Sequence, residues 1–375
     1  MPHGETGNFA DGLESVVAAE TVLSKVDGEA GVLILRGHYL QAIAGHRSFE
    51  WLTGLLWQDL VSGVFDEAAV RRDLGAARVR AFARMEALLP IAGRLPPLAA
   101  VRLLTAGLPD EGDEAPLLLT ATIAVGLAAV LRIRDGKHPV PPDPTSGHAA
   151  DFLRMLKDAA PAAEEAAALE AYLVSAADHG LNASTFAARV AASTQASLTD
   201  AVTAALCALK GPLHGGAPGP VLDMLDAIGP VENAETWLDR AVMRGDRLMG
   251  FGHRVYRVQD PRSDVVKSVV ERLNRDAGRL RYAEAVEKAA LAVLVRRKPN
   301  RSLQTNLEFY TALLLEALGL PRDAFTGAFA VARVVGWIAH ALEQQASGRL
   351  MRPQSEYVGP TPDLSWQRSN ELASP

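Results

Sequence analysis

The sequence is poor in cysteine and in positive charge. Its 375 residues include one cysteine, Cys207, so no disulfide can form within the chain. A chain without disulfides suits the reducing cytoplasm, where we expect the protein to reside. Cys207 stands in a helical stretch rich in alanine and leucine, and we expect it to be a small core residue rather than a nucleophile.

The net charge of −6 argues against a nucleic-acid-binding protein, which would need a basic face. It leaves anionic small-molecule substrates open, because a few local arginines can bind them. No histidine or cysteine pair has the spacing of a metal site, so we expect no metal. The first twelve residues show no basic region followed by an apolar run, and we expect no signal peptide.

Aromatic residues are also scarce, at 6%, whereas hydrophobic residues make up 49% and alanine is abundant. Alanine has the highest helix propensity, and small side chains let helices pack closely. We therefore expect a mainly α protein with a large core, possessing two or three domains by length. Only residues 13–49 have strand character, in Val16-Val17 and in residues 31–35, and there we expect two or three short strands.

Beyond residue 49, apolar residues recur at three- and four-residue spacing, which is the period of a helix with one buried face. Residues 115–131 form the most apolar stretch, but its threonines and glycine favour a buried core helix over a membrane span. The predicted helices cover residues 49–61, 67–89, 98–106, 115–131, 149–157, 162–177, a segment capped by Asn182 or Ser184 and running through Arg189, 198–210, a run from Val221, 237–247, 260–273, 282–297, 306–318 and 324–346.

Two histidines lie beside glycines at helix ends. His214 stands in Gly211-Pro212-Leu213-His214-Gly215-Gly216, and His253 follows Gly250-Phe251-Gly252. Gly and Pro end the preceding helices, and the glycines let a ligand approach the backbone. A histidine titrates near neutrality and can relay a proton, so each is a candidate catalytic group. The alternative at each position is a solvated histidine in a turn.

A cation and a carboxylate stand out on the later helices. Arg333 has the apolar neighbours Phe329, Val334, Val335 and Trp337, so a buried guanidinium there must be paired; an exposed polar stripe is the alternative. Glu308 lies in the first turn of a predicted helix. The helix dipole favours an acidic residue at that place, which is the structural explanation; the functional one is a general base.

The order and spacing of several motifs resemble the citrate synthase family over nearly the whole chain. They are Asp178-His179 with Asn182, Ser184, Thr185 and Phe186; Gly211-Pro212-Leu213-His214-Gly215-Gly216-Ala217; Gly250-Phe251-Gly252-His253-Arg254-Val255-Tyr256; Asp260-Pro261-Arg262; and Arg333 with Gly336, Trp337, Ala339, His340, Glu343 and Gln344. Residues 13–37 also look like the short N-terminal β-element of that family.

The resemblance implies a fold and a function. Residues 1–213 and 320–375 would form a large domain, and residues 214–319 a small domain that closes over the substrates. The protein would be a homodimer of the compact bacterial form, with shared active sites. It would be an acyltransferase of the citrate (Si)-synthase type, which condenses acetyl-CoA with oxaloacetate and hydrolyses the product to citrate and CoA. Acetyl-CoA is then a substrate, and no cofactor is needed.

The resemblance also implies a role for each candidate residue. His214 would bind the thioester carbonyl, His253 would polarise the ketone of oxaloacetate, and Glu308 would be the base. The carboxylates of oxaloacetate would be held by His179, Arg262, Arg333 and, from the partner subunit, the residue at the position of Arg352. Coenzyme A would be bound by Gly250, Phe251, Gly252 and Arg257.

One position departs from the pattern of the family, whose usual base is aspartate where this chain has Glu308. The longer side chain requires a helix that is set back, a different acyl group, or slow turnover. Two alternatives to citrate synthase stay open: a 2-methylcitrate synthase that uses propionyl-CoA, and a non-catalytic homologue that binds acyl-CoA or a dicarboxylate.

Overall fold

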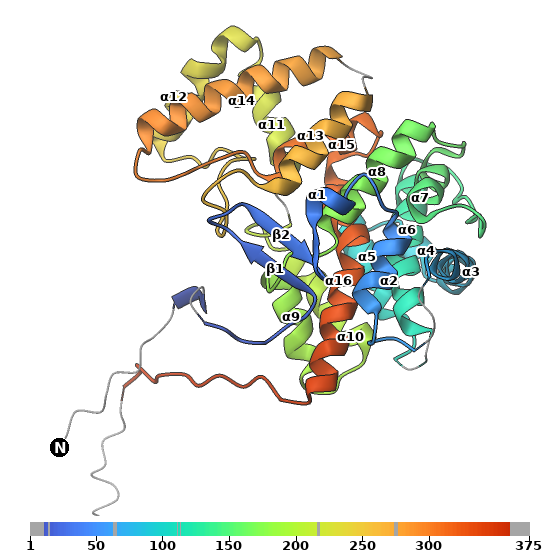
Figure 1. Ribbon diagram of the computed structural model, residues 1–375. Helices are drawn as coiled ribbons and strands as arrows, with labels where there is room; N and C mark the ends of the chain where they lie inside the picture. The colour runs from blue at the N-terminus through green and yellow to red at the C-terminus, as the bar shows by residue number, and fades with distance from the viewer. Residues whose placement is uncertain are drawn as a thin grey trace, which may run out of the picture.

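A small antiparallel sheet precedes a long succession of helices in the computed structural model, which describes residues 11–13, 16–62, 66–110, 112, 114–215, 218–273 and 277–360 (Figure 1). The strands β1 (Ser24–Asp27), β2 (Val32–Leu35) and β3 (His38–Tyr39) pair in that order, with Ser24 opposite Leu35. The prediction of two or three short strands is confirmed. Val16 and Val17, however, lie outside the sheet, and Glu14 of the β-element motif lies outside the described residues.

The prediction of a mainly α fold is confirmed as well. The helices are α1 (Leu40–Ile43), α2 (Phe49–Trp57), α3 (Glu67–Met85), α4 (Leu89–Ala92), α5 (Pro97–Ala106), α6 (Ala115–Arg134), α7 (His148–Lys157), α8 (Ala163–Ala176), α9 (Ala183–Ala192), α10 (Leu198–Leu209), α11 (Pro218–Ile228), α12 (Ala234–Arg244), α13 (Pro261–Leu273), α14 (Ala277–Arg297), α15 (Leu307–Ala317) and α16 (Phe325–Ser347), with the 3₁₀ turns η1 (Asp11–Leu13), η2 (Val231–Asn233) and η3 (Arg322–Ala324).

Two helix boundaries differ from the prediction for identifiable reasons. The helix expected over residues 67–89 ends at Met85, because Pro90 has no N–H with which to continue it, and α4 begins separately. The helix expected over residues 237–247 lies earlier, because Gly245 ends it in a left-handed conformation with φ of 88°.

Helix α16 runs through the middle of the helical body and packs against α6, α8, α9 and α10 (Figure 1). The α6 helix and the segment Arg322–Ala346 are long and apolar enough to cross a membrane, but 89% and 83% of their apolar windows are buried inside the protein. The buried core helix predicted at residues 115–131 is therefore confirmed.

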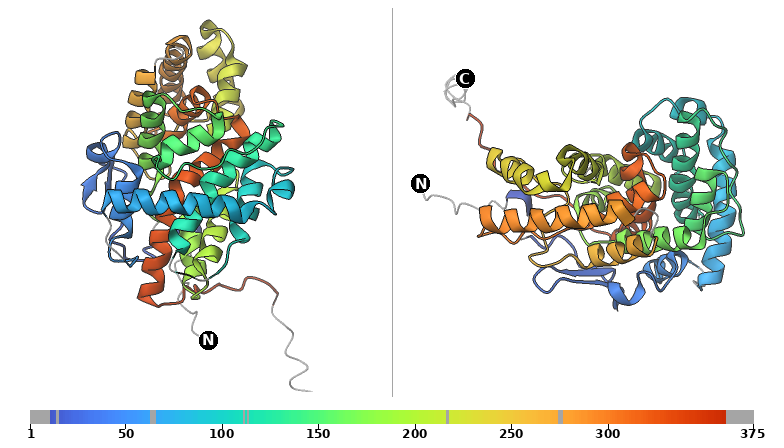
Figure 2. Two further views of the ribbon diagram at one scale, coloured as in Figure 1. Left: turned by 90° about the vertical axis from the view of Figure 1, so that its right-hand side faces the viewer. Right: turned by 90° about the horizontal axis from the view of Figure 1, so that it is seen from above.

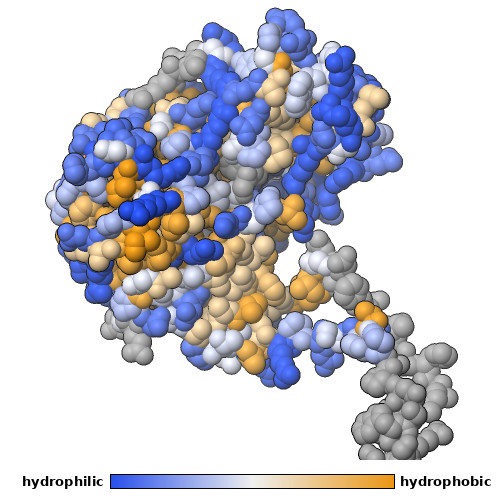
Figure 3. Space-filling view, turned by 180° about the vertical axis from the view of Figure 1, so that it is seen from behind, coloured by the Kyte–Doolittle hydropathy of each residue, from blue (hydrophilic) through white to orange (hydrophobic). Residues whose placement is uncertain are grey.

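Helices α11, α12 and α14 lie together at one end of the molecule, and the described ends of the chain leave the body on one side (Figures 1 and 2). Figure 3 shows the molecule from behind the view of Figure 1. On that face the end formed by α12 and α14 is mostly polar, whereas apolar surface gathers lower on the helical body. Whether residues 214–319 move as a separate domain stays a prediction.

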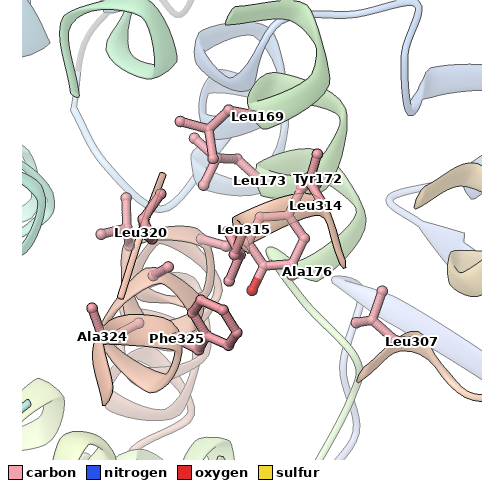
Figure 4. Packing of buried hydrophobic residues seen from close by; sticks show 14 of the residues in the cluster. Leu169, Tyr172, Leu173, Ala176, Leu307, Leu314, Leu315, Leu320, Ala324 and Phe325 are labelled. Atoms are coloured by element: carbon pink, nitrogen blue, oxygen red, sulfur yellow. The ribbon is translucent and has the colours of Figure 1, made fainter. Parts of the chain in front are cut away.

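The core extends to the site through the packing of α8, α15 and the start of α16. Leu169, Leu173, Leu314, Leu315 and Phe325 gather there in one apolar cluster (Figure 4). Each of these side chains is at most 1% exposed, so the three helices are held in a fixed relation. This packing fixes the backbone from which Glu308 and Arg333 project.

The expectation for Cys207 is wrong. Its side chain is exposed on α10, with its sulfur 3.7 Å from Nη1 of Arg102. The buried face of α10 is instead formed by Ala201, Val202, Ala205, Leu206 and Leu209. Cys207 follows Leu206 on the helix and falls outside this face, which an alanine-rich pattern does not reveal.

Candidate active site

A short backbone bridge carries both His253 and Glu308. Phe251 pairs with Thr305, the N–H of Gly252 donates to the carbonyl of Gln304, and the carbonyl of Gly250 accepts from the N–H of Asn306. Gly250 has φ of 85°, and a Cβ there would lie 2.8 Å from the ring of Phe309. Only glycine therefore permits this close approach, and the two predicted catalytic segments are held next to each other.

The β1–β2 hairpin supports the loop that follows His253. The carbonyl of Gly28 accepts from the N–H of Arg257, and a Cβ on Gly28 would lie 2.1 Å from the carbonyl oxygen of Val255. The hairpin thus packs directly on this loop, which explains why a three-stranded sheet persists in a helical protein.

The hydrogen bonds of His253 define its tautomer. Its Nδ1 accepts the N–H groups of Val255 and Tyr256 at 3.0 and 3.2 Å. A neutral ring then carries its proton on Nε2. Burial, followed by the charge of Arg262, lowers the pKa of His253 to about 4, so the ring is neutral near pH 7.

Arg262 stands beside His253 in the first turn of α13. Asp260 holds it, since Nε donates to Oδ1 at 3.0 Å and Nη2 donates to Oδ2 at 2.8 Å. The same Nη2 lies 3.4 Å from Nε2 of His253. Two N–H donors that converge at this distance suit an oxygen of an anionic ligand. Asp260 Oδ2 also accepts from the N–H of Leu307, which links α13 to the start of α15.

His179 completes this side of the site. Its ring lies 5.3 Å from that of His253, and its Nε2 is 3.1 Å from the hydroxyl of Tyr256. Burial lowers the pKa of His179, and the charges of Arg262, His253 and Arg333 lower it further. Three positions predicted from separate motifs, 179, 253 and 262, are thus brought together.

Arg333 is buried, which excludes the exposed stripe that the sequence left open. The residue is 1% exposed, and its guanidinium donates from Nε to the carbonyl of Ala176 at 2.5 Å and lies 4.7 Å from the ring centroid of Phe329. Burial lowers the pKa of Arg333 to about 10, against the opposing effect of Asp178. Among the described residues the bond to Ala176 is the only hydrogen bond of Arg333, so its two terminal nitrogens are available to bind an anion.

His214 lies on the Phe329 side of Arg333, with its ring 6.3 Å from that of Phe329. Its Nε2 is 2.8 Å from the hydroxyl of Ser184, which also accepts from Nε1 of Trp337 and donates to Oδ1 of Asn182 at 2.8 Å. The hydroxyl has one proton to give, so its choice between Asn182 and His214 sets the tautomer of His214. Burial, followed by Arg333, lowers the pKa of His214 to about 4.

Glu308 lies in the first turn of α15, as predicted. The side chain is half-buried, and its Oε2 is buried without a hydrogen-bond partner in the part of the chain that the structure describes. Burial raises the pKa of Glu308, and Arg262 opposes that effect. Glu308 is only half-buried, and its carboxyl group lies in the field of Arg262 and Asp260, which suits a group that acts on a ligand.

The segment predicted to bind coenzyme A, residues 250–252, takes part in core packing and in backbone hydrogen bonds. The side chain of Phe251 is 4% exposed and packs on Phe309, and the bridge engages the N–H of Gly252 and the carbonyl of Gly250. Asn306 also donates to the carbonyl of Gly252. These groups are therefore occupied in this structure, whereas the side chain of Arg257 is exposed.

One predicted site residue stands apart from the others. Arg352 is exposed in the extended segment that follows α16 and runs away from the helical body (Figure 1). Gly216 and Ala217 lie outside the described residues. Across the described ranges, no group of three or more His, Cys, Asp or Glu side chains could hold a metal ion.

Sequence reasoning gave no role to several side chains that orient the site. They are Ser184 and Trp337 against His214, Asp260 against Arg262, Tyr256 against His179, and the buried Tyr172, whose hydroxyl has no partner among the described residues. Most stand within the motifs quoted above, but the residues they contact are far along the chain. Tyr172 had no signal beyond a helical apolar pattern.

Taken together, the site joins neutral imidazoles, buried guanidinium groups and a carboxyl group of raised pKa. This set suits acid–base catalysis on an anionic substrate, because the cations bind the anion while the carboxylate and imidazoles move protons. The site is thus that of an enzyme rather than of a purely structural polar core.

Comparison with known proteins defines the class. Residues 12–354 match the family described as "Citrate synthase, C-terminal domain". The chain is 36% identical to citrate synthase of Haloferax volcanii, over 94% of this chain and 97% of that protein. It is 36% identical to citrate synthase 2 of Bacillus subtilis, over 93% and 95%.

A solved structure agrees in fold. A ternary complex of citrate synthase from Thermoplasma acidophilum with carboxymethyl coenzyme A and oxaloacetate superposes with a TM-score of 0.85 at 27% identity, covering 95% of this chain and 97% of that chain. The chain belongs to the citrate synthase family, and it is an acyltransferase of that family.

Proposed function

We propose that the protein is a citrate synthase, which converts acetyl-CoA, oxaloacetate and water to citrate and CoA. The observation that carries the proposal is Glu308: a carboxyl group with a raised pKa and an unpartnered buried oxygen, beside a cationic pocket. The ternary complex of the Thermoplasma acidophilum relative with oxaloacetate and a coenzyme A analogue supports this choice of substrates.

Oxaloacetate is a dianion, and the proposed pocket has the charges to hold it. Arg262 and Arg333 bind its carboxylates, with His179 as a further donor. Nε2–H of His253 and Nη2 of Arg262, which lie 3.4 Å apart, then converge on substrate oxygens. His253 in this way polarises the ketone and makes its carbon electrophilic.

Carbon–carbon bond formation requires a nucleophilic methyl group. The Glu308 carboxylate removes a proton from the methyl group of acetyl-CoA, while His214 donates a hydrogen bond to the thioester carbonyl and stabilises the enolate. For this role the Ser184 hydroxyl, which donates to Oδ1 of Asn182 in this structure, turns its proton to Nε2 of His214, so that Nδ1 carries the donated hydrogen.

The enolate carbon then attacks the ketone carbon, and the electron pair of the C=O bond becomes an alkoxide. His253 gives this oxygen its Nε2 proton and regains one from the protonated Glu308, so both groups end as they began. Water attacks the thioester of the resulting citryl-CoA, the C–S bond breaks, and CoA leaves as the thiol. We assign attack to the si face of oxaloacetate, and the configuration of citrate made from labelled acetyl-CoA tests this assignment.

An assay of thiol release tests the function. We expect release that depends on oxaloacetate and is faster with acetyl-CoA than with propionyl-CoA. One additional methylene group changes binding by about 1–3 kcal/mol, so some use of propionyl-CoA is expected. Faster release with propionyl-CoA would make the protein a 2-methylcitrate synthase. No release with either thioester would leave a binding protein.

We also propose a homodimer in which Arg352 of each chain serves the active site of its partner. Arg352 lies on a segment that leaves its own helical body, and Leu350, Tyr357 and Val358 on that segment are 58%, 72% and 90% exposed. The apolar surface on the body is a further reason to expect a partner (Figure 3). Light scattering should give twice the chain mass; a monomer with full activity would refute this proposal.

A further inference from the structure

One carboxylate outside the site described above, that of Glu287 on α14, holds the chain at two points. Its Oε1 accepts from the hydroxyl of Thr305 at 2.6 Å, and its Oε2 accepts from the hydroxyl of Tyr310 at 2.5 Å. Thr305 and Tyr310 are 1% and 0% exposed, so neither hydroxyl has water as an alternative partner. Both of these hydrogen bonds have an ionised acceptor, which makes them stronger than neutral ones.

These two points lie on either side of Glu308. Thr305 precedes Asn306, the residue before α15, and Tyr310 ends the first helical turn. Thr305 also forms the backbone bridge with Phe251, two residues before His253. Glu287 therefore ties the first turn of α15 and the bridge to α14 with a single side chain.

The place of the Glu308 carboxylate depends on that turn. The Glu308 side chain has three rotatable bonds, and its Oε2 has no partner among the residues described. A displacement of about 1 Å from the reacting atom can cost on the order of a hundredfold in rate. We propose that Glu287 is a positioning residue for Glu308: by holding Thr305 and Tyr310, it sets the approach of the base to the substrate methyl group.

The inference rests on the proposed function, and the surrounding charges provide a control for it. Glu284 lies on α14 about one turn before Glu287. Nζ of Lys267 on α13 lies 3.5 Å from the carboxylate of Glu287 and 3.4 Å from that of Glu284. The same Nζ also lies 5.1 Å from the ring centroid of Tyr310. No hydrogen bond from Glu284 to Thr305 or Tyr310 is present within the described ranges, so Glu284→Ala removes a carboxylate beside Lys267 and leaves both ties intact.

Steady-state kinetics of Glu287→Ala, Glu287→Gln and Glu284→Ala provide the first test. We expect Glu287→Ala to lower kcat about 10- to 100-fold, while the Kd for oxaloacetate stays within about twofold, because the groups that hold its carboxylates, His179, Arg262 and Arg333, lie on other elements. Glu287→Gln can still accept from Thr305 and donate to Tyr310, so it should keep kcat within about fivefold. Glu284→Ala should resemble the wild type.

Two milder variants keep the test valid if Glu287→Ala does not fold. Tyr310→Phe and Thr305→Val each remove one tie, and we expect kcat to fall about 3- to 10-fold for each, with unchanged oxaloacetate binding. The kcat of the double variant Tyr310→Phe, Thr305→Val should approach that of Glu287→Ala. Adding Glu287→Ala to the double variant should lower kcat little further. Equal kcat values for Glu287→Ala and Glu284→Ala, or a Glu287→Gln variant as slow as Glu287→Ala, would overturn the proposal.

Amide hydrogen exchange reports on the ties without any reaction. Glu287→Ala should speed exchange in residues 305–311 relative to Glu284→Ala and leave α16 unchanged. Unchanged exchange in residues 305–311 would overturn the positioning role. A wild-type protein that releases no thiol but shows this exchange difference would refute the proposed function alone.

Discussion

Two buried clusters of charged and polar residues can be compared in this molecule. The Glu308 cluster, at the candidate active site, consists of Glu308, His253, Asp260, Arg262 and Arg333. The Glu50 cluster, between α2, α3, α7 and α8, consists of Glu50, Arg78, His148, Asp151 and Glu170. Each cluster includes a buried arginine that is paired with an aspartate. Each also includes a glutamate whose Oε2 has no partner among the described residues.

Access from solvent distinguishes them. Glu50, Arg78, His148 and Asp151 are all 0% exposed and only Glu170 at the edge of that cluster is half-buried, whereas Glu308 and His253, the proposed reacting groups of the other cluster, are both half-buried. His148 stacks on Phe49 at 5.1 Å, and neither of its ring nitrogens has a partner in the described part of the chain. Burial and the charge of Arg78 lower the pKa of His148. An unpartnered histidine beside a glutamate is therefore no mark of catalysis unless a ligand can reach it.

The largest expected effect comes from the Glu308 cluster. Glu308→Gln should lower kcat by about 10³-fold or more, because the amide cannot take the proton, while oxaloacetate binding stays measurable by calorimetry. The corresponding change in the other cluster, Glu50→Gln, should leave turnover of the folded protein within about threefold. Near-normal turnover of Glu308→Gln would show that another group is the base.

Asp151→Ala, in the Glu50 cluster, should lower the stability of the fold rather than the rate of turnover. It removes the carboxylate that lies 2.7 Å from Nε of the buried Arg78 and leaves that charge without its ion-pair partner. Breaking such a pair costs about 3–5 kcal/mol of unfolding free energy, which urea denaturation measures. The molecules that stay folded should keep their kcat, and a loss of kcat without a loss of stability would join the two clusters functionally.

A smaller effect depends on pH. Burial, followed by the charge of Glu50, raises the pKa of Glu170 from 4.5 to about 7. Between pH 4.5 and about 7, Glu170 is protonated in the folded protein but ionised in the unfolded chain. The free energy of unfolding therefore falls as the pH rises through this range, and the full loss is present above about pH 7. Glu170→Gln should raise the unfolding free energy by about 1–3 kcal/mol at pH 8 and hardly at all at pH 4.

The smallest effect is expected outside both clusters. Cys207→Ser changes an exposed thiol on α10, so the unfolding free energy should stay within about 0.5 kcal/mol of the wild type, with normal thiol release. A loss above about 2 kcal/mol would mean that the thiol is covered in solution, for instance by the second chain of the dimer that we propose.

Local signals in the sequence predicted most of the fold. Helical periodicity with Gly, Pro and Asn at the ends located nearly every helix, including α9, where Asn182 accepts from the N–H of Thr185 as a cap does. The same signals failed where packing decides. Val16 and Val17 have strand-forming side chains but no neighbouring strand, and Cys207 has apolar neighbours but points outward.

For the candidate site, the sequence indicated the groups to which we assign chemistry but not the groups that orient them. His253 was recognisable from its glycines and Arg333 from its apolar neighbours. Ser184 meets Trp337 across a separation of 153 residues, and Asp178 meets His340 across 162. Such contacts depend on how the helices pack, and no local pattern encodes them. The Glu50 cluster gave no signal for the same reason.

The N-terminal segment is tied to the last helix, since the N–H of Val22 donates to Oε1 of Glu343, 321 positions later. That helix also contributes Arg333 and Trp337. During synthesis the hairpin at residues 24–35 therefore leaves the ribosome long before its final neighbours exist, and the pocket cannot close until almost the entire polypeptide has emerged. A nascent chain stalled before residue 325 would expose the surface that α16 later covers, which makes chaperone capture at that stage of translation a natural consequence of this architecture.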